Sequence, residues 1–150
     1  MAHDSASTNR LAHGPLNWAI RLHETVYRWT GGRLGGRMGP LPTLLLTTTG
    51  RKSGQPRTIP LIYFPAGDRL VVVASNGGQD QPPAWYLNLR AYPMASVQIG
   101  KEHRPVRAVV APPAVRARLW PQVVARNPAY AGYERKTDRE IPMVILYPVT

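Results

Sequence analysis

The chain has 150 residues, of which 43% are hydrophobic and 18% charged, and this size and mixture exclude both a multidomain protein and an intrinsically disordered chain. Nineteen Lys and Arg residues against eight Asp and Glu give a formal net charge of +11, which calls for an anionic partner such as nucleic acid, an acidic lipid surface or a polyanionic small molecule. The chain has no cysteine, so disulfides, thiolate metal sites and cysteine nucleophiles are excluded.

The N-terminal part predicts a polar leader followed by one helix. Residues 1–15 hold no apolar block long enough for a signal peptide, and no segment reaches the ~20 apolar residues that a membrane-spanning helix needs. We therefore expect a cytoplasmic protein. Residues 16–30 carry apolar side chains at helical spacing, and Gly31 and Gly32 end the predicted helix. Residues 16–40 are thus expected to form an amphipathic helix and a Gly/Arg-rich linker.

This helix allows two interpretations. Its apolar stripe fits a helix that docks on the rest of the domain. Its second face fits a helix lying in a lipid headgroup layer, which would bring residues 16–37 to the inner face of the plasma membrane. The side chains that favour the membrane are two tryptophans and four arginines: Trp18, Trp29, Arg21, Arg28, Arg33 and Arg37.

After residue 40 the pattern changes from helical to extended. Runs of β-branched and apolar residues predict three consecutive strands, at 43–49, 57–64 and 70–75. The Gly- and Pro-containing segments between them, 50–56 and 66–69, predict tight turns. We expect the three strands to form an antiparallel meander.

Prolines mark the next elements. A short helix is predicted to begin after Pro82 and Pro83 and to end before Pro93, and two strands follow at 95–99 and 104–111.

A second helical stretch begins at Pro112, and Pro121 must kink or divide it. Tyr130 and Tyr133 share a face if their segment is helical, and a last strand is predicted at 141–149. The fold class is therefore mainly β with α (α+β). About six antiparallel strands form a small closed or nearly closed barrel over residues 41–150, with short helices at its rim.

Nucleotide and metal motifs are incomplete. The glycines of GGRLGGRMG lack the Gly-x-Gly-x-x-Gly register and follow a helix rather than a strand, and TTTGRKSGQ lacks the spacer of a Walker loop. The four histidines are scattered without carboxylates at ligand spacing, so no metal site is expected. No Gly-x-Ser-x-Gly elbow is present.

The segment GRKSGQPR, residues 50–57, carries the most specific chemistry. A tight turn exposes backbone N–H groups, while Arg51, Lys52 and Arg57 converge on it from the two arms of a hairpin. Arginine supplies paired donors and Ser53 a hydroxyl, which suits phosphate or carboxylate oxygens. A solvated basic hairpin tip is the alternative.

Two further features are candidates for a pocket. Residues 74–78 end a strand with two glycines, which let a flat ligand approach the backbone. Trp85 and Tyr86 follow this loop, and Tyr130 and Tyr133 precede the last strand. Core packing is the usual role of such aromatics, but tyrosine hydroxyls at the rim of a pocket can hold or protonate a carbonyl oxygen.

Four separated motifs occur in one order: LLLTTTGRKSGQPRTIPL, VVVASNGGQDQPPAWYLNL, NPAYAGY and TDREIPMVILYP. Together they closely resemble the deazaflavin (F420)-dependent nitroreductase family of the flavin/deazaflavin oxidoreductase superfamily, over roughly residues 16–150. The resemblance implies a split β-barrel that binds reduced coenzyme F420, a deazaflavin with a phosphate and a poly-γ-glutamate tail. That tail is a polyanion of the kind that the net charge calls for.

The resemblance also implies roles for individual residues. The phosphate and tail carboxylates are expected at Arg51, Lys52, Ser53 and Arg57. The deazaflavin is expected to be lined by Thr58, Ile59, Pro60, Leu61, Ile62, Ala74, Ser75 and Asn76. The short helix is expected to close over the deazaflavin with Ala84, Trp85, Tyr86, Leu87 and Asn88, and Tyr130 is expected to cap the pocket. The catalytic candidates are Tyr133, which would face the second substrate, and Ser75.

In the family, a hydride passes from C5 of the reduced deazaflavin to an electrophilic acceptor such as a quinone, an activated alkene or a nitroaromatic, and the protein mainly positions and polarises. We expect such a reductase here, with a membrane quinone as acceptor. An FMN-binding split-barrel reductase is one alternative. A non-catalytic module that binds nucleic acid or an acidic membrane is another. Nucleic acid is not expected, because the positive charge is spread, +6 over residues 1–60 and +5 over 61–150.

Three positions depart from the family pattern. Nitro-reducing members present a tyrosine at the position of Ile62, a lysine at Asn76 and an aromatic residue at Asn127. These changes leave the basic turn untouched and alter the pocket over the ring. The resemblance therefore specifies the cofactor more closely than the acceptor, and it leaves the oligomeric state open.

Overall fold

The computed structural model describes residues 37–38 and 41–150. The polar leader, the predicted helix at 16–30 and its membrane contact lie outside the described residues and stay predictions. Among the helices that are described, none has the length and apolar character needed to span a bilayer.

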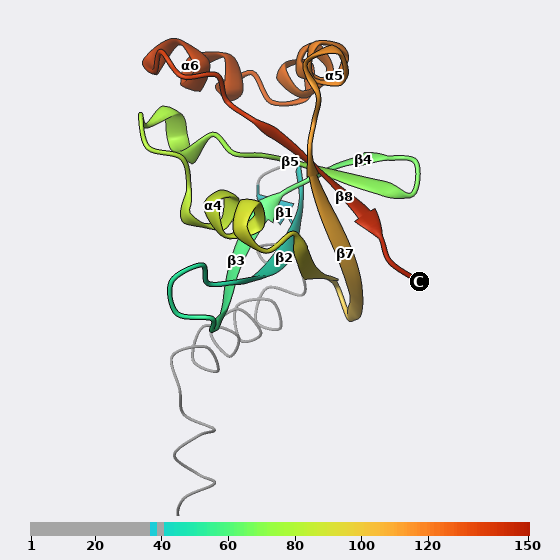
Figure 1. The fold of residues 1–150 in the computed structure, drawn as a ribbon. Coiled ribbons are helices and arrows are strands. Elements are labelled where there is room, and N and C mark those ends of the chain that lie inside the picture. Colours follow the sequence, from blue (N-terminus) through green and yellow to red (C-terminus); the bar gives the residue numbers. More distant parts are fainter. Residues whose placement is uncertain (1–36, 39–40) are drawn as a thin grey trace, which may run out of the picture.

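The described residues build one antiparallel sheet of eight strands, which curls into a half-barrel (Figure 1). Along the sheet the strands follow the order β1-β2-β6-β7-β8-β5-β4, and β3 pairs with β2. Their bounds are Arg37–Met38 (β1), Leu41–Thr49 (β2), Pro56–Ile62 (β3), Phe64–Ala66 (β4), Arg69–Val73 (β5), Met94–Ile99 (β6), Glu102–Val110 (β7) and Met143–Pro148 (β8). Every pairing is antiparallel, so the predicted fold class is confirmed.

Within the described residues, three α-helices flank the half-barrel. Helix α4 (Ala84–Ala91) packs on β2, and α5 (Pro113–Arg126) and α6 (Ala129–Lys136) lie together at one end of the molecule (Figure 1). The proline pairs start α4 and α5 as predicted. Pro121 does not divide α5, which runs through it to Arg126.

The predicted strand at 57–64 is in fact two strands. β3 pairs with β2, whereas β4 pairs with β5, and the backbone N–H of Tyr63 at the break donates to the carbonyl of Pro42 (3.1 Å). The predicted three-strand meander is therefore wrong. Side chains continue to alternate through the break, with Leu61 and Tyr63 packed on one core cluster and Ile62 on the other. Because alternation is unbroken, the residue pattern does not reveal the change of partner.

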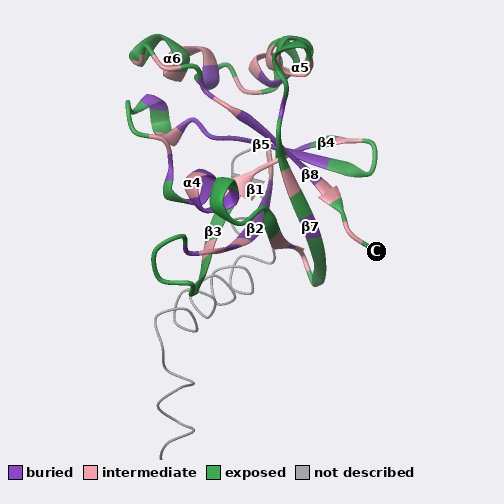
Figure 2. Ribbon diagram, in the orientation of Figure 1, coloured by how far each residue is buried: buried purple, intermediate pink, exposed green. Residues whose placement is uncertain are grey.

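The core consists of two clusters on opposite faces of the sheet, and β5 contributes to both. Val72 packs in the cluster that includes Trp85 of α4, while Val71 and Val73 pack in the cluster under α5 and α6. A strand covered on both faces explains the uninterrupted apolar run LVVVAS. Buried residues concentrate in β2, β5 and β8 and on one side of α4, whereas β7 is mostly exposed (Figure 2).

Candidate functional site

Two cavities lie along β3, the first between β3 and α4 and the second between β3, the loop after β5 and α6. The first, which we call the basic-end cavity, has a volume of about 360 Å³ and is lined by Thr48, Gly50, Arg51, Lys52, Ser53, Arg57, Thr58, Ile59, Ala84, Trp85 and Asn88. The second, the tyrosine-end cavity, has a volume of about 300 Å³ and is lined by Ile59, Pro60, Leu61, Ile62, Val73, Ser75, Asn76, Gly77, Pro83, Trp85, Asn127, Tyr130 and Tyr133. Ile59 and Trp85 line both, so the two cavities are neighbours, and we call the pair the groove.

The basic turn is held by its own backbone. The N–H of Gly50 donates to the carbonyl of Gln55 (2.7 Å), and the N–H of Gly54 donates to the carbonyl of Gly50 (2.8 Å). Gly54 has a φ of 70°, a left-handed conformation that glycine adopts without strain. The Ser53 hydroxyl accepts from the N–H of Gln55 (3.1 Å) and from Nη2 of Arg57 (3.4 Å). Arg57, on the second arm of the hairpin, therefore contacts the turn at Ser53.

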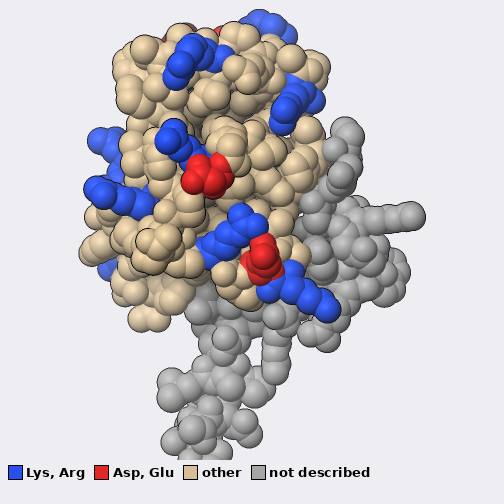
Figure 3. Space-filling model, turned by 90° about the vertical axis from the view of Figure 1, so that its right-hand side faces the viewer, with Lys and Arg blue, Asp and Glu red and all other residues tan. Residues whose placement is uncertain are grey.

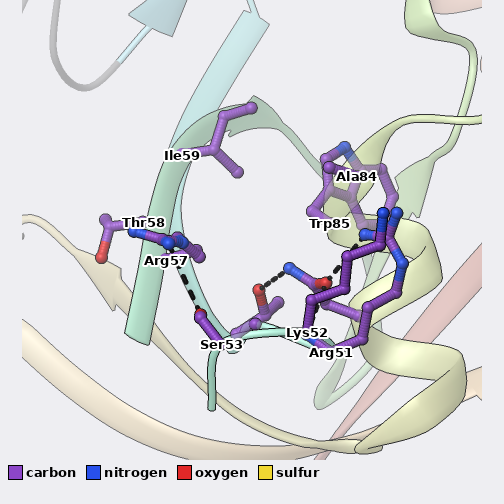
Figure 4. A pocket seen from close by; sticks show the side chains of 11 residues that line it. Arg51, Lys52, Ser53, Arg57, Thr58, Ile59, Ala84 and Trp85 are labelled. Carbon is purple, nitrogen blue, oxygen red and sulfur yellow. Dashed lines mark hydrogen bonds between the residues drawn. The ribbon is translucent and has the colours of Figure 1, made fainter. Parts of the chain in front are cut away.

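Asn88 ties this turn to helix α4. Its side chain is buried, its Oδ1 accepts from the backbone N–H of Arg51 (3.1 Å) and from Nη1 of the same residue (3.3 Å), and its Nδ2 donates to the hydroxyl of Thr48 (3.1 Å). Figure 4 shows Arg51 and Lys52 of the turn and Trp85 of α4 around the basic-end cavity. A buried amide that makes three hydrogen bonds within the protein orients its partners. Asn88 therefore positions Arg51 at the mouth of the basic-end cavity.

The cations of the turn have no acidic partner in residues 41–150. Four of the six Asp and Glu side chains of that range pair with Arg69, Arg104 or Arg116, and none of the six lies within salt-bridge distance of Arg51 or of its neighbours in the turn. The turn residues are exposed, yet they line a cavity, which favours the anion clamp over a solvated hairpin tip. Figure 3 shows other Lys and Arg residues spread over a second face rather than aligned in a stripe.

Tyr130 forms the closed side of the tyrosine-end cavity. Its ring is 5% exposed and meets the rings of Phe64, Trp120 and Tyr133 edge-on, with centroid separations of 6.0, 6.4 and 5.8 Å. Burial, with a smaller effect of Tyr133, raises the pKa of Tyr130 to about 12, against a lowering by a hydrogen bond with Asn127. The hydroxyl therefore stays protonated well into the alkaline range, where it can still donate a hydrogen bond.

The loop after β5 forms the wall opposite α6. Asn76 has a φ of 48°, and its amide donates to the carbonyl of Gln81 (2.9 Å). A Cβ built on Gly78 would lie 2.8 Å from the carbonyl oxygen of Tyr133. Of the two glycines expected to admit a flat ligand, only Gly77 lines the cavity. Gly78 instead admits the backbone of α6.

The structure brings most of the predicted site residues into the groove. Ala74, Tyr86 and Leu87 lie outside both cavities. Ala74 and Tyr86 are buried in the core, and Leu87 packs against it. For Tyr86 and Leu87 the reason is the helical period, which turns Trp85 and Asn88 of α4 toward the groove and the two residues between them away.

The three positions that depart from the family pattern all line one cavity. Ile62, Asn76 and Asn127 belong to the tyrosine-end cavity, and none lines the basic end. Sequence reasoning missed Thr48, although its alternation with Leu44 and Leu46 places it on the α4 side of β2. It also missed Arg139, whose partners are backbone carbonyls. Within the described ranges no group of three or more His, Asp or Glu residues could hold a metal ion.

Comparisons with known proteins agree with this geometry. Residues 18–148 match the model of a family described as F420H(2)-dependent quinone reductase. The chain is 45% identical over 132 residues to an F420H(2)-dependent quinone reductase of Mycobacterium tuberculosis strain H37Rv, a match that covers 85% of this chain and 88% of that protein.

Two solved structures share the fold with substantial identity. An F420-H2 dependent reductase (FDR-A) is 40% identical, with a TM-score of 0.64, over 70% of this chain and 93% of that one. A structure described as a domain-swapped dimer is 36% identical, with a TM-score of 0.66, over 89% of this chain and 99% of that one. The curled antiparallel sheet with helices at its rim is thus the split-barrel fold.

Proposed function

The chain belongs to the F420H(2)-dependent quinone reductase family, and on that premise we propose that it transfers a hydride from reduced coenzyme F420 to a quinone. The observation that carries this proposal is the groove, which joins a cationic turn without acidic partners in residues 41–150 to a cavity of mixed polarity bearing two tyrosines. The FMN alternative gains no support from relatives whose names specify F420H2.

The donor groups of the basic end fit the acidic part of F420. Phosphate and carboxylate oxygens take paired hydrogen bonds from guanidinium groups and single bonds from backbone N–H groups. Arg51, Lys52 and Arg57 supply the charge, and Asn88 holds the first of them in place. We assign the phosphate and the glutamate tail to this end.

The middle of the groove fits a flat ring. Consecutive residues of β3 from Arg57 to Ile62 line the two cavities, as expected of a strand that presents its edge rather than one face. Within the described part of the chain β3 pairs only with β2. Trp85 closes the groove from α4 at the junction of the cavities, so the ring is assigned between Ile59 and Trp85.

The tyrosine end fits the acceptor. When bound, reduced F420 supplies a hydride from C5 of its ring. The cavity is lined by both apolar and polar side chains, and a quinone carbonyl needs a hydrogen-bond donor as negative charge develops on its oxygen. Tyr130 holds its proton at neutral pH as any tyrosine does, and its raised pKa keeps the hydroxyl protonated into the alkaline range. Tyr133 and Ser75 line the same cavity and are assigned to the acceptor.

The acceptor assignment favours a quinone over a nitroaromatic. Ile62, Asn76 and Asn127, which replace residues of the nitro-reducing members, all line the tyrosine-end cavity. The family description and the curated relative both specify quinone reduction. Nitroaromatics and activated alkenes are therefore expected to be poorer acceptors than quinones.

The test uses the purified full chain. Reduced F420 is titrated into the protein at modest salt, and its oxidation is then followed by absorbance with menadione as acceptor. We expect saturable binding and menadione-dependent oxidation. A parallel titration with FMN and NADH measures the alternative. Turnover with FMN but none with reduced F420 would overturn the proposal.

A further inference from the structure

Arg139, which lies between α6 and β8, binds both ends of one loop. Its Nη2 donates to the carbonyl oxygens of Ala74 (3.3 Å) and Ser75 (2.9 Å), and its Nε donates to the carbonyl oxygen of Gln79 (2.9 Å). A charged donor makes stronger hydrogen bonds to carbonyls than a neutral one. One side chain therefore closes the segment 74–79 into a fixed arc.

The same segment makes a second set of contacts with α6 and the residues after it. The Thr137 hydroxyl donates to Oδ1 of Asp80 (2.8 Å) and accepts from the backbone N–H of Arg139 (3.3 Å). At Gly78 the two backbones are so close that a Cβ would lie 2.8 Å from the carbonyl oxygen and 2.9 Å from Cα of Tyr133. At Gly78 the loop therefore packs directly against the backbone of α6, and no side chain fits between them.

This junction forms two walls of the tyrosine-end cavity. The loop contributes Ser75, Asn76 and Gly77, and α6 contributes Tyr130 and Tyr133. Arg139 is not among the residues that line the cavity. Any effect of Arg139 on the reaction must therefore pass through the loop that it holds.

We propose that Arg139 is a positioning residue for the acceptor. By binding the carbonyls of Ala74, Ser75 and Gln79, it holds the wall from Ser75 to Gly77 at a fixed separation from Tyr133. The kinetic part of this proposal rests on the proposed function, whereas its structural part does not.

The proposal differs from a general role in folding because the two ends of the groove are built by different elements. The basic end belongs to the turn between β2 and β3 and to Asn88 of α4, and Arg139 makes no hydrogen bond to either. Loss of Arg139 should therefore affect the acceptor end and leave cofactor affinity nearly unchanged. Loss of a residue that only stabilises the fold would affect both ends.

The experiment compares Arg139→Gln and Arg139→Lys with the wild-type full chain. Hydrogen exchange by mass spectrometry is followed at residues 74–81 and 50–57. The backbone amides of Gly78 and Gln79 donate to carbonyls of the same loop (2.9 and 3.2 Å). Their exchange rates therefore measure how often the loop opens. In Arg139→Gln we expect their exchange to quicken by about tenfold or more, with no change at 50–57. Arg139→Lys, which keeps the charge and one donor, should recover part of the protection.

Kinetics give the second measurement. We expect kcat/KM for menadione to fall by about tenfold or more in Arg139→Gln, because small misplacements of reacting groups are costly. The Kd for reduced F420 should change by less than about threefold. Arg104→Gln is the matched control, because Arg104 pairs with Glu102 on the exposed β6–β7 hairpin. It should match the wild type in all three measurements.

A second variant tests the same junction without removing Arg139. Gly78→Ala adds a methyl group against the backbone of Tyr133 and should give the same kinetic pattern as Arg139→Gln. Gly67→Ala is its control, since Gly67 has a similar φ of 67° but no atom within 4 Å of the added Cβ. This pair decides the question if Arg139→Gln does not fold.

The outcomes are separable. If the wild type does not oxidise reduced F420 with a quinone, the proposed function fails, and the exchange data alone decide the structural part. If the wild type is active and Arg139→Gln retains its kcat/KM, the positioning role is overturned. Faster exchange at 50–57 together with weaker F420 binding would also overturn it, because both ends of the groove would then have loosened.

Discussion

Oδ1 of Asn88 lies 3.1 Å from the backbone nitrogen of Arg51 and 3.3 Å from its Nη1, so one buried amide fixes both the turn and the guanidinium that the turn carries. The helix residue and the turn residue are 37 positions apart in the chain. The anion clamp is therefore preorganised by α4. A cation held before binding loses less side-chain entropy when a ligand arrives.

Asn88→Ala should weaken both the fold and the clamp. It leaves the Thr48 hydroxyl and the backbone N–H of Arg51 without their partner, which costs about 1–3 kcal/mol when such groups are buried. We expect a lower free energy of unfolding in urea and a higher Kd for reduced F420. Gln122→Ala on the exposed side of α5 is the control. Equal Kd values for Asn88→Ala and wild type would show that Arg51 orients itself without the amide.

Replacing Arg51 and Lys52 together by alanine should weaken F420 binding far more than it slows chemistry at saturation. Charge-assisted hydrogen bonds to the phosphate or the tail contribute on the order of 1–3 kcal/mol. The loss should shrink as salt is raised, because the screened interaction is the one removed. Lys101→Ala, in the exposed β6–β7 turn, should bind as the wild type does. Unchanged affinity of the double variant for reduced F420 would show that the glutamate tail binds at another surface.

Tyr133→Phe should slow turnover and leave the Kd for reduced F420 unchanged. The hydroxyl is removed while the ring, whose centroid lies 5.8 Å from that of Tyr130, is kept. Steady-state kinetics with menadione measure kcat, and a separate titration measures the Kd. Tyr92→Phe is the control, because Tyr92 is 48% exposed and lines neither cavity. A rate equal to that of the wild type would remove the Tyr133 hydroxyl from the mechanism.

Local signals predicted most of the fold. Alternating β-branched residues located the strands, and the pairs Pro82–Pro83 and Pro112–Pro113 located the starts of α4 and α5. The basic turn was predictable because its cations are close in sequence and a hairpin brings its arms together by construction. Which strands pair with each other was harder to predict from the sequence. The break at Tyr63 keeps the alternation intact, so the pattern does not show that β3 and β4 pair with different strands.

The candidate site was predictable where its residues form motifs. A sequence motif is a continuous run of residues, whereas a helix presents only one side to a groove. The motif therefore included Tyr86 and Leu87, which the structure places outside both cavities. Arg139 gave no signal because its partners are carbonyls 60 to 65 positions away. Every residue has a carbonyl, and only the fold decides which ones meet a guanidinium.

Tyr130 should make stability fall at alkaline pH. Its pKa is raised to about 12 in the folded protein, above the value of about 10 in an unfolded chain, so the folded state holds this proton more tightly. The resulting stabilisation is fully present below pH 10 and is lost as the pH rises toward 12. A two-unit difference predicts a loss of about 2 kcal/mol between pH 9 and pH 12.

Tyr130→Phe isolates this effect, because the variant keeps the ring and removes the titrating group. The free energy of unfolding is measured for both proteins across that pH range, and the difference between them removes the contribution of the other tyrosines. We expect the wild type to lose its advantage over the variant as the pH rises. A constant difference would contradict the raised pKa, and with it the burial of the Tyr130 hydroxyl that raises it.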